Sequence, residues 1–219
     1  MRLEGQDRSL TTKRFVNCAG LFSDRVAALT GVDPQVRIIP FRGEYYDVGG
    51  RSADLVQSSI YPVPDPDLPF LGVHLTNGVD GSVHAGPNAV LAGAREGYRW
   101  RTVHPGDLWD SITYPGFRRL AAKHWRSGIA EVARSASRRR FAASVQELVP
   151  GIERADLRRG TSGVRAQAVT RDGALYDDFL VIAGPRSVHV LNAPSPAATS
   201  SLAIGDYLAD RIEESLDID

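Results

Sequence analysis

The sequence contains very little cysteine, and this scarcity excludes two classes of site. Cys18 is the single cysteine among 219 residues, so neither an internal disulfide framework nor a zinc site built from cysteines can form. No other pattern in the sequence predicts a metal site. Because a chain with so little cysteine suits a reducing compartment, we expect a cytoplasmic protein.

An excess of charge and a long apolar run are lacking as well. The 26 Lys and Arg residues balance the 26 Asp and Glu residues, so no global field attracts nucleic acid, and no nucleic-acid partner is expected. No apolar run approaches the roughly 20 residues that cross a bilayer, and residues 1–7 are unlike a secretion signal. A peripheral contact with the inner membrane stays open, because such surface patches are assembled in three dimensions.

The N-terminal region contains the pattern of half an α/β unit. Residues 13–20 form a short apolar run closed by glycine, which predicts a buried strand. Residues 23–31 predict a short helix, with Ser23 as its N-cap and Gly31 as its end. A strand followed by a helix needs a parallel partner strand, which we expect upstream although only a dozen residues precede it.

The next part of the chain predicts a mainly antiparallel sheet. Residues 36–48 alternate loosely and are rich in β-branched and aromatic residues, which is typical of one long strand, bent near Pro40 or Gly43. Turn-forming residues separate three further short strands, predicted at 59–63, 70–75 and 82–86. We expect one face of this sheet to be free for a ligand.

Helices are predicted over residues 106–149. The side chains that recur near helical spacing are Leu120, His124, Ile129, Val132 and Ala133. We expect two or three helices here, packed on the sheet.

The chain then returns to strands and closes with a helix. Strands are predicted at residues 160–170, 179–183 and 189–191. Residues 196–212 predict the closing helix, with Ser195 as its cap and Pro196 at its first position. The fold class is therefore mixed α/β (α+β), and we expect the two ends of the chain to pack together.

Seven short motifs, in this order, carry a resemblance to a known family. They lie at residues 16–24 (VNCAGLFSD), 40–46 (PFRGEYY), 61–65 (YPVPD), 69–74 (PFLGVH), 85–90 (AGPNAV), 163–167 (GVRAQ) and 191–198 (LNAPSPAA). Together they resemble the FAD-dependent L-2-hydroxyglutarate oxidases and dehydrogenases, within the amino-acid-oxidase-like flavoproteins. The resemblance implies oxidation of L-2-hydroxyglutarate to 2-oxoglutarate by hydride transfer to FAD, with oxygen or a quinone as electron acceptor.

The resemblance also implies a domain organisation. Residues 1–34 and 180–219 would form a partial, Rossmann-like FAD-binding layer, and residues 35–179 a mainly antiparallel substrate domain with helices. Members of the family begin with a Gly-x-Gly-x-x-Gly turn that holds the FAD pyrophosphate, and these 219 residues contain no such turn. We therefore expect a C-terminal half whose own binding of FAD is weak or absent.

The resemblance singles out two catalytic residues. His74 is the candidate general base, since an imidazole titrates near neutral pH. Arg165 is placed beside the flavin, where its planar guanidinium suits a bidentate carboxylate. Each also has a structural interpretation, a packed histidine and a surface ion pair.

Four more residues are candidates for binding the substrate. Arg42 could hold the distal carboxylate of a five-carbon diacid, and Tyr45, Tyr61 and Asn88 could donate hydrogen bonds. Alternation along a strand places Arg42 and Tyr45 on opposite faces unless Gly43 forms a bulge.

The flavin itself is expected at backbone positions flanked by small residues. The resemblance assigns to this site Asn17, Ala19, Gly20, Gly163, Val164, Asn192, Pro194, Ser195, Pro196, Ala197 and Ala198. The first amides of the closing helix would stabilise negative charge on the reduced ring. Two other interpretations stay open: a non-catalytic remnant, or a related enzyme for another 2-hydroxy acid, an amino acid or glycerol phosphate.

Overall fold

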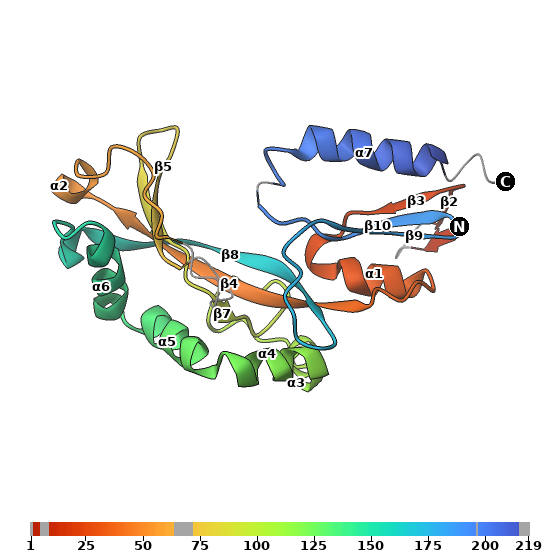
Figure 1. Ribbon diagram of the computed structural model, residues 1–219, viewed down its shortest axis with the longest axis horizontal. Coiled ribbons are helices and arrows are strands. Elements are labelled where there is room, and N and C mark those ends of the chain that lie inside the picture. Colours follow the sequence, from red (N-terminus) through yellow and green to blue (C-terminus); the bar gives the residue numbers. More distant parts are fainter. Residues whose placement is uncertain (1, 5–8, 64–71, 196, 215–219) are drawn as a thin grey trace. The chain divides into compact units, whose positions relative to one another are not determined.

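The computed structural model describes residues 2–4, 9–63, 72–195 and 197–214 (Figure 1). They form two compact units: unit 1 is the described part of Met1–Ile38 and Ala166–Asp219, and unit 2 that of Ile39–Arg165. Helices and mostly antiparallel strands confirm the expected mixed α/β fold. The predicted FAD-binding and substrate domains stay a prediction, because a division into compact units does not show which unit binds the cofactor. Among the described residues, no helix combines the length and the hydropathy of a membrane span.

Unit 1 is built on a small sheet that joins two distant parts of the chain. Its strands are β3 (Phe15–Asn17), β10 (Ser187–Asn192) and β9 (Leu180–Gly184). The buried central strand, β10, pairs parallel with β3 and antiparallel with β9. An upstream partner strand for β3 stays a prediction, because the parallel partner that the structure describes, β10, lies downstream, and the described residues before β3 do not pair with it. They form instead a hairpin of β1 (Arg2–Glu4) and β2 (Ser9–Thr11).

The predicted helix after β3 is confirmed, with a different start. A 3-10 turn, η1 (Gly20–Phe22), leads directly into α1 (Ser23–Leu29). Ser23 is thus a helical residue rather than the N-cap, and its buried hydroxyl finds no hydrogen-bond partner among the described residues. The end is as predicted: Gly31 has φ +82°, and the N–H groups of Gly31 and Val32 donate to the last turn of the helix.

The closing helix, α7 (Ser201–Glu214), starts later than predicted. Ser195 is therefore not its cap, and Pro196 lies outside the described residues. The preceding residues form turns, one of them closed by the Ala197 N–H donating to Pro194 O at 2.9 Å. The apolar residues that pack the helix on β10 are Ile204, Leu208 and Ile212. The helix therefore begins where apolar side chains recur every four residues and can be buried against β10.

Unit 2 contains a five-stranded sheet around one long strand. The predicted strand at 36–48 is confirmed in full as β4 (Val36–Val48). On one edge it pairs antiparallel with β6 (Val83–Gly86) and β7 (Val90–Leu91), and β5 (His74–Asn77) extends the sheet beyond β6. The remaining partner of β4 is β8 (Leu157–Thr170).

Two of the predicted short strands are wrong or displaced. Residues 59–63 form no strand, and only Ile60 makes an isolated bridge, with Leu75. Pro62 lacks the N–H that the next pair of ladder hydrogen bonds requires, which explains why the pairing stops. The strand predicted at 70–75 begins at His74, and its residues 70 and 71 lie outside the described part of the chain.

Four helices, rather than two or three, follow the sheet in the described chain. They are α3 (Pro105–Thr113), α4 (Pro115–Lys123), α5 (Trp125–Ala136) and α6 (Arg138–Leu148). Pro115 at the first position of α4 ends the preceding helix, because a proline restricts the residue before it. Ser137 separates α5 from α6, and its hydroxyl accepts from the Arg140 N–H at 3.4 Å.

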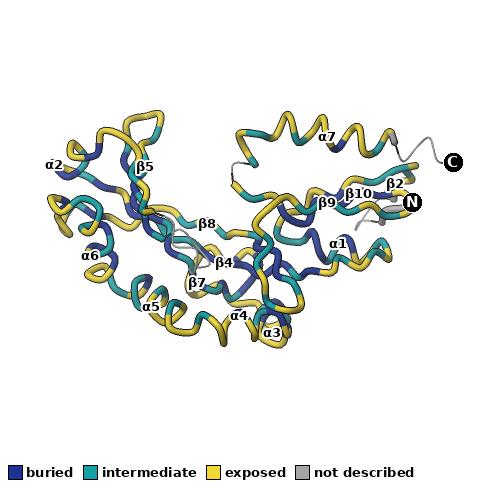
Figure 2. Tube along the Cα trace, viewed as in Figure 1, coloured by how far each residue is buried: buried dark blue, intermediate teal, exposed yellow. Residues whose placement is uncertain are grey.

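These helices bury their apolar residues unequally (Figure 2). Phe141 of α6 is fully buried and stacks on Tyr46 of β4, with 4.2 Å between ring centroids, in the core of unit 2. Leu120 of α4 is also buried. Helices α5 and α6 contact β7 and β5, as expected of helices packed on the sheet, but Ile129 and Val132 of α5 are 62% and 47% exposed.

Candidate functional site

A pocket of about 200 Å³ in unit 2 gathers six of the residues singled out in the sequence. These six are Tyr45, His74, Asn88, Gly163, Val164 and Arg165. The other residues around the pocket are Phe41, Gly43, Gly72, Pro87, Ala89 and Glu131. Segments far apart in the sequence thus converge on one small space.

Strand β4 forms one wall of the pocket through alternate residues. Phe41, Gly43 and Tyr45 all face it, as the two-residue period of a strand requires. The register of β4 is regular on both sides of this stretch, with Arg42 opposite Val90 and Tyr46 opposite Ala85. The face that was expected to be free for a ligand therefore carries Tyr45.

His74 is held in the tautomer that a base requires. Its Nδ1 lies 3.2 Å from Gly72 O, and because a carbonyl only accepts, Nδ1 carries the hydrogen and Nε2 the lone pair. Burial lowers the pKa of His74, the hydrogen bond to Gly72 opposes this shift, and the charge of Arg165 adds to it. The imidazole is therefore neutral at pH 7.

Tyr61 contacts His74 rather than the pocket. The two rings are stacked, with centroids 4.6 Å apart and planes inclined by 27°. The other face of Tyr61 is open, since the residue is 53% exposed. Its assignment to the substrate stays a prediction, and the stacked contact restrains the plane of the imidazole.

Tyr45 and Arg165 form a donor pair within the pocket. Burial raises the pKa of Tyr45 and the charge of Arg165 partly offsets this rise, so the phenol keeps its proton at neutral pH. Arg165 lies on β8 and is exposed. Both side chains can therefore donate to an anionic ligand.

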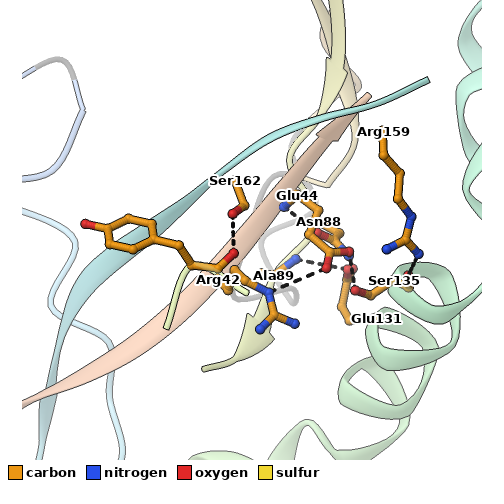
Figure 3. A network of polar contacts seen from close by, with 9 residues as sticks. Arg42, Glu44, Asn88, Ala89, Glu131, Ser135, Arg159 and Ser162 are labelled. Carbon is orange, nitrogen blue, oxygen red and sulfur yellow. Dashed lines mark hydrogen bonds and ion pairs between the residues drawn. The ribbon is translucent and has the colours of Figure 1, made fainter. Parts of the chain in front are cut away.

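Asn88 is buried, and its amide is oriented by Glu44 (Figure 3). The Glu44 N–H donates to Asn88 Oδ1 at 2.8 Å, and Asn88 Nδ2 donates to Glu44 Oε2 at 3.4 Å. The same carboxylate oxygen also accepts from the Ser135 hydroxyl of α5. Asn88 thus anchors the pocket wall as well as facing the pocket.

Arg42 lies on the other face of β4, away from the pocket. It is 2% exposed, its Nε is 3.5 Å from Glu44 Oε1, and its guanidinium sits 4.3 Å from the Trp100 ring centroid. Burial lowers the pKa of Arg42, and the charge of Glu44 opposes this. Its expected contact with a distal carboxylate finds no support in the lining of the pocket, since strand alternation turns it inward.

Sequence reasoning missed Glu131, which lines the pocket from α5. Its Oε2 accepts from the Ala89 N–H at 3.2 Å, and it is paired with Arg134. One signal was available: it is the single acidic residue between positions 111 and 146, among eight basic ones.

In unit 1, two of the predicted flavin segments follow adjacent parallel strands. Asn17 of β3 is paired with His189 of β10, so residues 18–20 and 193–195 leave the same edge of the sheet. Ala19, Gly20 and Ala193 are exposed there. The carboxyl end of parallel strands is where ligands of α/β sheets usually bind.

The two asparagines of this edge hold turns together. Asn17 Nδ2 donates to Ser23 O at 2.7 Å, and its Oδ1 accepts from the Ala19 N–H at 3.1 Å. Asn192 Nδ2 donates to the carbonyl oxygens of Tyr176 and Asp178 at 2.9 and 2.7 Å. Their assignment to a flavin site stays a prediction. Because both side-chain amides are engaged in these hydrogen bonds, the backbone around them is the surface available to a flavin.

Comparison with known proteins identifies the family of the chain. The family model described as FAD dependent oxidoreductase matches residues 2–211. The L-2-hydroxyglutarate dehydrogenase of Indibacter alkaliphilus is 50% identical over 203 residues, which cover 92% of this chain and 51% of that protein. The protein of the same name from Escherichia coli K12 is 45% identical over 201 residues, covering 92% and 48%.

The human mitochondrial L-2-hydroxyglutarate dehydrogenase is 45% identical over 208 residues, covering 93% of this chain and 45% of the human protein. The chain thus spans about half the length of the curated relatives it matches. The family model, by contrast, matches nearly all of it. The chain belongs to the family of FAD-dependent oxidoreductases.

Proposed function

We propose that this chain is the substrate-binding part of an enzyme that oxidises L-2-hydroxyglutarate to 2-oxoglutarate with FAD. The observation that carries the proposal is one pocket holding a neutral histidine, a tyrosine and an arginine: His74, Tyr45 and Arg165. The names of the relatives support this substrate. Oxygen or a quinone as electron acceptor, and a peripheral contact of a cytoplasmic enzyme with the inner membrane, belong to the same proposal.

The residues of the pocket have different roles in the proposed oxidation. Arg165 binds the carboxylate next to the reacting carbon through its planar guanidinium, and Tyr45 donates a hydrogen bond to the bound acid. His74 accepts the hydroxyl proton at Nε2, because its Nδ1 is already protonated. FAD, when bound, supplies the acceptor for the hydride that leaves the same carbon.

The residues present fit the flavin ring and not the nucleotide part of FAD. A Cβ added at Gly163 would meet no atom within 4 Å, so the pocket wall is open there for a flat ring. The volume of about 200 Å³ suits a five-carbon acid and is below the roughly 300–1,000 Å³ of larger ligand sites. The proposed flavin contacts are Gly163 and Val164 of unit 2 and, separately, the following residues of unit 1: Asn17, Ala19, Gly20, Asn192, Pro194, Ser195, Pro196, Ala197 and Ala198.

The test joins this chain to the N-terminal half of the Indibacter alkaliphilus relative. The purified chimera is expected to show flavin absorbance that L-2-hydroxyglutarate bleaches. Arg165→Lys should lower kcat/KM by about tenfold to a hundredfold, because the charge remains while the paired hydrogen bonds are lost. Arg158→Lys, an exposed arginine on the same strand, is the matched control and should leave kcat/KM unchanged.

Three results would contradict the proposal or a part of it. A colourless chimera that stays inactive with added FAD favours a non-catalytic remnant. Bleaching by an amino acid or glycerol phosphate, but not by L-2-hydroxyglutarate, favours a different substrate. Unchanged kinetics in Arg165→Lys would remove Arg165 from the site.

A further inference from the structure

The proposed substrate is a diacid, and the cations that line the pocket account for only one of its carboxylates. Within the described part of the chain, Arg165 is the one arginine or lysine of the lining, and His74 is neutral. Arg42, which was expected to hold the distal carboxylate, lies on the other face of β4. Because a carboxylate that leaves water needs a charged or hydrogen-bonding partner, we expect a second cation beside the pocket.

Arg134 of α5 is a cation that its neighbours on the helix place next to the pocket. Glu131, one turn earlier, lines the pocket and accepts from the Ala89 N–H at 3.2 Å (Figure 3). The same glutamate is paired with Arg134. The next residue, Ser135, donates to Glu44 of β4. Residues three and four apart share one face of a helix, so Arg134 belongs to the side of α5 that contacts the pocket wall.

A larger cavity beside the pocket gives separate evidence for this position. It has a volume of about 710 Å³, and Arg134 is one of its lining residues. The two cavities have Phe41, Gly72, Ala89 and Glu131 in common. Since Arg134 is paired with one of these four shared residues, its guanidinium lies near the boundary between the two cavities.

The guanidinium of Arg134 has donors left for a ligand. Its Nη2 donates to Glu131, whereas its Nε is buried and finds no hydrogen-bond partner among the described residues. A buried N–H without an acceptor is destabilising, and an acceptor supplied by a ligand would remove this penalty. A guanidinium carries five N–H donors, so the contact with Glu131 leaves enough of them for a second carboxylate.

We propose that Arg134 binds the distal carboxylate of the diacid and makes the pocket selective for dicarboxylates over monocarboxylates. Glu131 orients its guanidinium, while Arg165 binds the carboxylate next to the reacting carbon. The two carboxylates of the substrate then meet two arginines from different elements, α5 and β8. The inference rests on the proposed function, because the five-carbon diacid is the substrate named there.

Binding of two five-carbon acids to the 219-residue chain tests this role without flavin or turnover. Glutarate carries two carboxylates and pentanoate only one, and neither has a hydroxyl group to oxidise. NMR titrations at neutral pH should give a Kd for glutarate about tenfold to a hundredfold below that for pentanoate, since the extra contact is a charge-assisted hydrogen bond. Arg134→Gln should remove this difference by weakening glutarate binding alone. Arg126→Gln, an exposed arginine of the same helix, is the control and should keep the difference.

A double variant separates direct binding from neutralisation of Glu131. Glu131→Gln with Arg134→Gln removes both charges of the pair, so the net charge beside the pocket equals that of the native chain. The preference for glutarate should stay lost, because the guanidinium that binds the distal carboxylate is absent. Arg134→Lys keeps the charge beside Glu131 but loses the planar donors. It should reduce the preference several-fold, and it provides the test if Arg134→Gln fails to fold.

Four results would overturn the inference. They are equal affinities of the native chain for the two acids, a full preference for glutarate in Arg134→Gln, a preference that returns in the double variant, and an equal loss of affinity for both acids in Arg134→Gln. An inactive chimera would contradict the proposed function without changing these affinities, so the two failures are distinguishable.

Discussion

At the scale of single residues, His74 and His189 show how the neighbours of an imidazole decide which nitrogen carries its proton. His74 Nδ1 donates to Gly72 O. His189 Nδ1 instead accepts from Asn17 Nδ2 at 3.1 Å, so its Nε2 carries the hydrogen and donates to Ser187 Oγ at 2.8 Å. His74 is thus left with a free lone pair on Nε2 in the pocket, whereas both nitrogens of the buried His189 are hydrogen-bonded within unit 1.

His189 predicts an acid-sensitive unit 1. Burial lowers the pKa of His189, so the unfolded chain takes up the proton first as the pH falls. The stability it contributes is complete above the ordinary pKa of about 6.5 and is lost as the pH falls through the lower pKa of the folded state. Urea titrations of the chain between neutral and mildly acid pH should show this loss.

His189→Gln is the test variant, and His124→Gln is its matched control. His189→Gln should lower the free energy of unfolding at neutral pH by about 1–3 kcal/mol, since it disrupts the buried contact with Asn17. It should also flatten the dependence on pH. A slope equal to that of the native chain would mean that another group causes the acid sensitivity.

At the scale of elements, the contact between β4 and residues 86–89 shapes the pocket. A Cβ added at Gly43 would lie 2.6 Å from Pro87 Cβ and 3.1 Å from Asn88 O. Strand and loop therefore approach as closely as only glycine permits. Gly163, on the neighbouring strand β8, has open space instead.

This difference predicts opposite effects of two alanine substitutions in one pocket. Gly43→Ala should lower the free energy of unfolding by about 1–3 kcal/mol, because the rigid Pro87 ring and the backbone must shift. Gly163→Ala should leave stability equal or raise it by about 0.4–1 kcal/mol, since alanine restricts the unfolded chain. Thermal unfolding of both proteins measures this, and equal midpoints would contradict the close approach at Gly43.

At the scale of the whole molecule, weak binding of FAD is the expectation. The chain lacks the glycine-rich turn for the pyrophosphate, and Ala19, Gly20 and Gly163 are exposed to water, which weakens any electrostatic contact. Fluorescence titration of the 219-residue chain with FAD should give a Kd weaker than about 1 μM. The chimera with the Indibacter half is the positive control, and tight binding by the chain alone would overturn the expectation.

Local patterns in the sequence were sufficient for features that depend on near neighbours. The two-residue period of β4 placed Tyr45 on the pocket face and Arg42 on the other, and Gly31 ended α1 as its lack of a Cβ allows. The family motifs selected His74 and Arg165, which the fold then brought to one pocket.

Only the tertiary structure decided the features that depend on long-range contacts. The partner of β3 came from residues 187–192, and α5 turned its polar side inward to satisfy Glu44 and Ala89. Helical spacing specifies that Ile129 and Val132 share a face, but not what that face meets. The sequence thus determined periods, turns and family, while burial and hydrogen bonding between distant segments determined orientation and tautomer.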